Sequence, residues 1–139
     1  TSTREGTPPA MLHNFMHNRV VHQQIVLLTV TTSESARVSE SRRFTVEDLD
    51  HGFVRVIGRY GFMEQPDAPR LLHDAGVIGS VEHVTFFLGR ENLIATAQPG
   101  MAKWRVGLFA FFTRNAQPAT KFFNIPPDRV FEIGAQIEL

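Results

Sequence analysis

A strand-like run that leads directly into a helix start, "FVRVIGRYGFMEQPDAPRLLHDAG", constrains the fold of this chain more than any other segment. Strand side chains alternate between two faces, and the alternation places five residues on the apolar face: Val54, Val56, Gly58, Tyr60 and Phe62. Arg59 falls on the opposite, mixed face. Pro66 suits the first turn of the following helix, and Asp67 suits its positive N-terminal end. A strand joined to a helix in this way predicts an α/β fold.

The segments that precede residue 53 also alternate between predicted helix and predicted strand, as an α/β fold requires. The 3–4 spacing of apolar residues predicts a helix over 8–18. The almost wholly apolar run Ile25–Val30 predicts a strand buried on both faces, and "SESARVSES" is a polar loop. Two β-rich runs flank the turn-prone "DLDHG", which predicts a β-hairpin.

Later segments add two more strands and two more helices. A strand over 81–89, which "ENLIAT" extends or pairs with, follows the helix, and this order predicts a parallel crossover. Met101–Phe112 has a helical apolar stripe, 117–123 predicts a short helix, and 131–139 alternates as a half-buried strand. The expected fold is therefore α/β, a single domain with a mixed, mostly parallel β-sheet flanked by helices and including one β-hairpin.

Composition limits the function classes. The 139 residues fit one domain, and 14 basic residues balance 14 acidic ones, which leaves no overall positive field for a nucleic acid. The absence of cysteine excludes disulfides and thiol catalysis. No apolar run approaches the ~20 residues that cross a bilayer. We expect a soluble domain.

Candidates for catalysis and metal binding are weak. His13 and His17 have the i,i+4 spacing of a zinc pair, with His22 nearby, but "HNFMH" lacks the glutamate of the HExxH motif. A polar helix flank is the favoured interpretation. Glu64 and Asp67 could form an acid/base pair, yet a helix-capping role already explains Asp67. No nucleophile elbow, Walker loop or dinucleotide fingerprint occurs in the sequence, so we expect no catalytic residue, metal or cofactor.

Two arginines near strand ends are the remaining candidates. Arg59 and Arg90 could bind an anion, because ligands of open α/β sheets collect near strand ends. They could equally form salt bridges with Glu64 and Glu91. We favour the salt bridges, because charges balance locally along the chain.

Five blocks of sequence, in order and at family-like spacing, carry a resemblance: "TPPAMLHNFMHNRVVHQQIVLLTV", "RYGFMEQPD", "FFLGREN", "PGMAKWRVGLFAFFTRNA" and "FFNIPPDRVFEIGAQIEL". They resemble the C-terminal cytosolic domain of bacterial KUP-type potassium uptake transporters (KUP/HAK/KT family). The resemblance spans 7–139, and "SESARVSES" is the least similar part.

The resemblance implies a non-catalytic regulatory or assembly role for residues 1–139. The parent would be an inner-membrane transporter that imports K⁺ by proton symport, with this tail on the cytoplasmic face. The membrane region and a preceding strand, of which "TST" would be the remnant, would be absent. The implied partners are the membrane domain of the same transporter and a second copy in a homodimer, with no nucleic acid.

An alternative function also follows from the resemblance. Some related potassium importers bind cyclic di-AMP, so the tail could be a nucleotide-sensing module for cyclic di-AMP or an adenine nucleotide. The loop-to-helix start at "REGTPP" could offer N–H groups to a phosphate. The candidate ligand contacts are Arg4, Thr7, Arg59 and Arg90.

Overall fold

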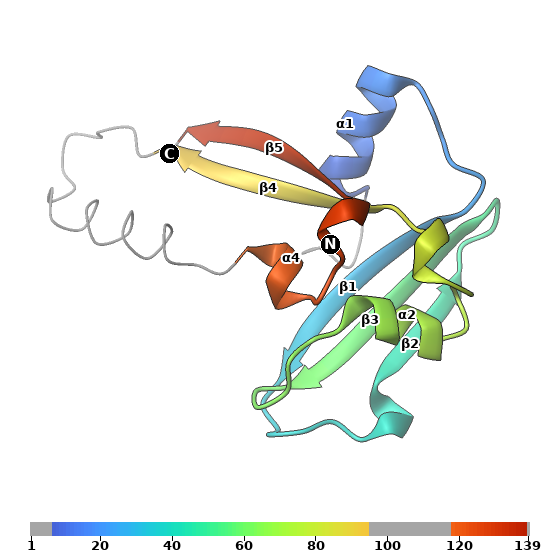
Figure 1. Ribbon diagram of the computed structural model, residues 1–139, viewed down its shortest axis with the longest axis vertical. Coiled ribbons are helices and arrows are strands. Elements are labelled where there is room, and N and C mark those ends of the chain that lie inside the picture. Colours follow the sequence, from blue (N-terminus) through green and yellow to red (C-terminus); the bar gives the residue numbers. More distant parts are fainter. Residues whose placement is uncertain (1–6, 95–117, 139) are drawn as a thin grey trace, which may run out of the picture.

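The computed structural model describes residues 7–94 and 118–138. In this part of the chain the strands form two sheets, one with the order β1-β3-β2 and one that pairs β4 with β5 (Figure 1). The strands are β1 (Ile25–Ser33), β2 (Phe44–Asp48), β3 (Phe53–Gly61), β4 (Phe86–Ile94) and β5 (Val130–Glu138). The predicted α/β fold with a mixed sheet, mostly parallel pairing and one hairpin is confirmed. The division into two sheets was not predicted.

Short helices connect these strands. They are α1 (Pro9–Asn18), α2 (Ala68–Asp74), α4 (Ala119–Phe122) and the 3₁₀-helices η1 (Glu40–Arg42), η2 (Val81–His83) and η3 (Pro127–Arg129). The predicted helices that correspond to α1, α2 and α4 are confirmed. The helix predicted over Met101–Phe112 lies outside the described residues. None of the described helices is long and apolar enough to cross a bilayer.

The first sheet contains the predicted hairpin. β2 pairs antiparallel with β3, from Phe44 opposite Gly58 onward, and the connecting turn has positive φ at Asp50, His51 and Gly52 (66°, 54° and 82°). β1 runs parallel to β3 on its other side. The prediction that β1 is buried on both faces is wrong, because Thr29 is its one buried residue. Among the described strands, β1 lies at the edge of this sheet and pairs with β3 alone.

The core lies between β3 and α2. Val56 is fully buried, and Tyr60, Leu71 and Leu72 are 8%, 2% and 3% exposed. Gly58 lies so close to Leu71 that a β-carbon there would collide with the leucine side chain. The apolar face predicted for β3 is thus confirmed at these positions.

The same prediction is wrong for Phe62, whose exposed fraction is 64%. β3 ends at Gly61, and a turn follows in which the N–H of Phe62 donates to the carbonyl of Ser35 (3.1 Å). Alternation stops where the strand stops, so Phe62 no longer shares the core face.

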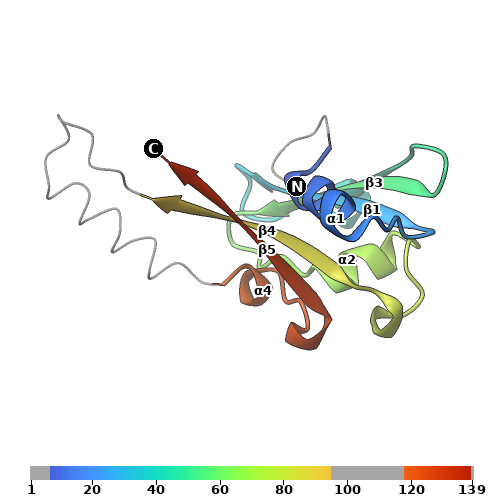
Figure 2. The same ribbon diagram turned by 90° about the horizontal axis from the view of Figure 1, so that it is seen from above.

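The second sheet shows where the crossover prediction fails. β4 pairs in parallel with β5, from Phe86 opposite Val130 onward, and it does not pair with β3 in the described part of the chain. Phe86 nevertheless joins the common core. On the other side of β4, Ala10 of α1 lies against Gly89, so α1 is placed beside the second sheet (Figure 2).

Candidate functional site

The end of β3 holds a dense set of polar contacts centred on Glu64. Its carboxylate accepts hydrogen bonds from the backbone N–H groups of Gly61 (2.6 Å) and Val38 (3.0 Å). It also accepts two from the guanidinium of Arg43, at 3.0 and 2.7 Å. The side chains of Arg43 and Glu64 are only 12% and 16% exposed. A bidentate arginine–carboxylate pair of this kind is geometrically specific. Together with the contacts of Val38 to Glu64 and to Arg43, it joins the 34–43 segment to the turn that follows β3.

The contact between Arg43 and Glu64 stabilises the charged forms of both side chains. The hydrogen bonds from Arg43, followed by that from Gly61, hold the pKa of Glu64 at about 2, below its usual value of 4.5. The same contact with Glu64 raises the pKa of Arg43 above its usual value. The Arg43 guanidinium also lies over the ring of Tyr60, 4.9 Å from its centroid. Glu64 is therefore ionised at neutral pH and is poorly suited to general acid or base chemistry.

Tyr60 and Asp67 continue the contacts toward α2. The Tyr60 hydroxyl donates to the backbone carbonyl of Asp67 (3.1 Å) and accepts from its N–H (3.3 Å). Burial raises the pKa of Tyr60. The Asp67 carboxylate accepts from the N–H of Arg70 (2.9 Å), which caps α2, and from the side-chain amide of Asn124 (2.7 Å). The predicted capping role of Asp67 is confirmed, and the cap also links α2 to the turn after α4.

The salt bridge predicted between Arg59 and Glu64 is wrong. Arg59 donates to the hydroxyl of Thr45 (2.8 Å) and to the carbonyl of Arg42 (3.5 Å), whereas Arg43 occupies the Glu64 carboxylate. The hairpin register contains the signal that could have identified Arg43. Phe44 lies opposite Gly58, so the residue before Phe44 must lie beside the end of β3. Asn124 has no comparable signal in the sequence.

The four residues predicted to contact a nucleotide are not brought together in the described part of the chain. Arg59 lies on the first sheet, while Thr7 is exposed and precedes the helix that lies beside the second sheet. Arg4 lies outside the described residues, and so does the side chain of Arg90, whose backbone belongs to β4. The nucleotide contacts stay a prediction.

The N-terminal histidines make ring contacts. The rings of His13 and His17 stack with their centroids 5.9 Å apart, and the ring of His22 lies 5.9 Å from that of Phe87. Among the residues that the structure describes, no group of three or more His, Cys, Asp or Glu side chains could hold a metal ion.

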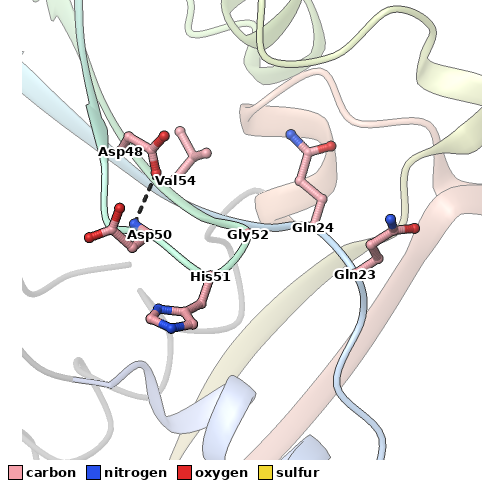
Figure 3. A pocket seen from close by; sticks show the side chains of 7 residues that line it. All are labelled: Gln23, Gln24, Asp48, Asp50, His51, Gly52 and Val54. Atoms are coloured by element: carbon pink, nitrogen blue, oxygen red, sulfur yellow. Dashed lines mark hydrogen bonds between the residues drawn. The ribbon is translucent and has the colours of Figure 1, made fainter.

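A hollow of about 580 Å³ lies at the hairpin turn and the start of β1. It is lined by Gln23, Gln24, Asp48, Asp50, His51, Gly52 and Val54. In Figure 3 the side chains of Gln23 and Gln24, just before β1, and of Asp50 and His51, in the hairpin turn, do not point toward one another, and Asp48 accepts a hydrogen bond from the N–H of Asp50 (2.9 Å). Binding sites for small molecules place a few convergent polar groups in an apolar cavity. This hollow lacks such convergence.

Comparison with known proteins identifies the family. Residues 1–139 match the family described as the K⁺ potassium transporter C-terminal domain. The chain belongs to this family. The resemblance to the C-terminal domain of KUP-type transporters is thereby confirmed.

Relatives of this potassium transporter domain carry consistent names. The chain is 54% identical over its full length to a "Probable potassium transport system protein Kup" of Myxococcus xanthus, of which it covers 22%. It is 48% identical to proteins of the same description from Pseudomonas aeruginosa and Rhodopseudomonas palustris, and it covers 22% and 23% of them. The chain thus spans less than a quarter of the length of these relatives. No solved structure matches it significantly.

Proposed function

We propose that this chain is a non-catalytic cytosolic regulatory or assembly domain of a KUP-type potassium transporter. The observation that carries the proposal is the match of residues 1–139 to a family named for the C-terminal domain of such transporters. In the proposed arrangement the chain lies at the cytoplasmic face of the inner membrane. It docks against the membrane part of the same transporter and against a second copy of itself, and K⁺ import proceeds by proton symport in the membrane part.

The contacts at the end of β3 support a mechanical role. The Arg43–Glu64 pair and the Val38–Glu64 contact join the 34–43 segment to the turn that follows β3. The Asp67–Asn124 contact joins α2 to the turn after α4. Polar groups that are tied together in this way rigidify a structure. A rigid domain could bias transport by its position, because displacing any one of these elements would displace the others.

Removal of the domain tests the proposal. Cells that lack other potassium importers would express the whole transporter, either intact or truncated before this chain, and would be grown at limiting K⁺. We expect truncation to change growth or to change the oligomeric state of the solubilised transporter at equal expression. Unchanged growth together with unchanged assembly would contradict the proposed role.

A further inference from the structure

β1 has the sequence of an interior strand, although it lies at the edge of its sheet among the described strands. Its nine residues include no charged side chain and begin with the aliphatic run "IVLL". β2, at the opposite edge, is five residues long and ends in Glu47 and Asp48. Short length and charged side chains protect an edge strand against unwanted pairing. β1 has neither protection, which indicates that a further strand belongs beside it.

The backbone of β1 shows which groups would meet that strand. The N–H of Ile25 donates to the carbonyl of Gly52, just before β3 (2.8 Å), so Ile25 directs its backbone groups toward β3. Successive residues of a strand direct these groups to opposite sides. Val26 and Val30, at odd separations from Ile25, therefore direct theirs away from β3.

The second sheet shares a core with β1 but does not pair with it. Phe86 and Leu88 of β4 belong to, or pack against, the same apolar cluster as Val26 and Val30 of β1. In Figure 1, β4 lies on the side of β5 that faces β1. Two strands that flank a third lie about 10 Å apart. One strand between β1 and β4 would pair with both and would join the two sheets into one.

The helices α1 and α2 lie on opposite faces of β4. Ala10 of α1 lies where a β-carbon of Gly89 would point, whereas Phe86 belongs to the same core cluster as Leu71 of α2. Because side chains alternate along a strand, residues 86 and 89 point to opposite faces. Helices on both faces are typical of a parallel sheet with right-handed crossovers.

This arrangement of the helices favours a position for the added strand. A helix that leads into a parallel strand, as α1 leads into β1, is the second half of a strand–helix–strand unit. Right-handed crossovers that step in opposite directions across a sheet place their helices on opposite faces. A step from between β1 and β4 to β1 is opposite in direction to the step from β3 to β4, as the faces of α1 and α2 require. A strand added beside β2 would instead place α1 on the face of α2.

The polypeptide that precedes α1 is the segment that can supply this strand. The matched family is named for a C-terminal domain, and the chain covers only 22% of its Myxococcus xanthus relative. Most of such a transporter therefore precedes the domain in sequence, and its polypeptide enters the domain through α1.

We propose that the segment preceding α1 in the whole transporter forms a strand between β1 and β4, parallel to both. The completed sheet has the order β2-β3-β1-segment-β4-β5. The proposal rests on the proposed function, because the segment comes from the side of the membrane part. Added strands are held by main-chain hydrogen bonds. The membrane part is thus attached to the centre of the sheet, where its displacement acts directly on β1 and β4.

Hydrogen exchange in the purified whole transporter tests the proposal with a matched control. Val30 and Val46 each follow a threonine, so their N–H groups have similar intrinsic exchange rates. Val46 of β2 also directs its N–H away from β3, because it lies three residues after Arg43, whose carbonyl accepts from Arg59 (2.7 Å). Mass spectrometry with residue-level fragmentation should show the Val30 N–H exchanging about a hundredfold or more slowly than the Val46 N–H. Equal exchange would overturn the proposal.

Photocrosslinking identifies the segment beside β1. A benzophenone amino acid would replace Thr32, which is exposed near the end of β1, or Val46 as the control. Mixed light and heavy isotope-labelled transporters would distinguish crosslinks within one molecule from those between two. We expect Thr32, and not Val46, to crosslink within one molecule to a peptide that precedes α1. Crosslinks only between molecules, or none to this segment, would overturn the proposal. Either failure leaves the truncation test of the proposed function unaffected.

Discussion

Loss of the Tyr60 hydroxyl tests the network at the end of β3 most cleanly. Tyr60→Phe keeps the ring, which is 8% exposed in the core, and removes the two hydrogen bonds with the backbone of Asp67, at 3.1 and 3.3 Å. The backbone groups of Asp67 would then lose a partner beside the start of α2. The variant therefore measures the link between β3 and α2 without creating a large cavity.

The structure sets the expected magnitude. A neutral hydrogen bond contributes about 1 kcal/mol net, so loss of both should lower the free energy of unfolding by about 2 kcal/mol. The entropy of unfolding is about 2.1 cal/mol/K per residue, so a chain of 139 residues should melt about 7 °C lower. Urea denaturation and thermal melting followed by circular dichroism would measure both quantities.

The control for Tyr60→Phe is Ser41→Ala, which removes a hydroxyl from the exposed pair with Ser39 (3.3 Å). Its expected effect is below about 0.5 kcal/mol. Hydrogen exchange should show faster exchange of the Asp67 N–H in Tyr60→Phe. A change in unfolding free energy as small as that of Ser41→Ala would refute the proposed role of the hydroxyl.

Three further predictions concern stability. The pKa of Glu64 is about 2 in the folded protein against 4.5 when unperturbed, so the ionised carboxylate stabilises the fold. Glu64→Gln should therefore lower the free energy of unfolding most above about pH 5, and the difference from the wild type should shrink as the pH falls toward 2. A loss that does not vary with pH in urea titrations would contradict this. Gly61→Ala would place a β-carbon against the backbone of Ala36 and Arg37 and should lower the free energy of unfolding by about 2 kcal/mol or more. Gly79→Ala, with nothing within 4 Å, should have little effect. Leu71→Ala should lower the free energy of unfolding by about 3 kcal/mol, because Leu71 is 2% exposed. The control is Leu12→Ala, because Leu12 is 48% exposed. An equal loss of unfolding free energy in the two variants would contradict the assigned core.

Local patterns in the sequence predicted the elements well. Alternation identified the buried face of β3 at Val56 and Tyr60. The aspartate signal located the start of α2 at Asp67, although the proline in the first turn of this helix is Pro69 and not the predicted Pro66. These features depend on neighbours along the chain. They could therefore be inferred without knowing the rest of the fold.

Features that depend on distant neighbours were missed. Parallel pairing of β4 with β5 joins strands separated by a long connection, so adjacency in sequence pointed to the wrong partner for β4. Arg43 and Arg59 both belong to the end of the hairpin that precedes Glu64, and only the hairpin register indicates that Arg43 is its partner. The helical period of α1 was evident, but it does not reveal whether the apolar stripe faces the core or solvent.

The central claim is that this domain controls or assembles a potassium transporter. The most direct measurement is the initial rate of rubidium uptake into vesicles reconstituted with purified transporter, with and without residues 1–139, normalised to the number of transporter molecules. A changed rate per molecule, or loss of the oligomer that supports it, is the result that the proposed role predicts. Equal rates from equally assembled transporters would contradict it.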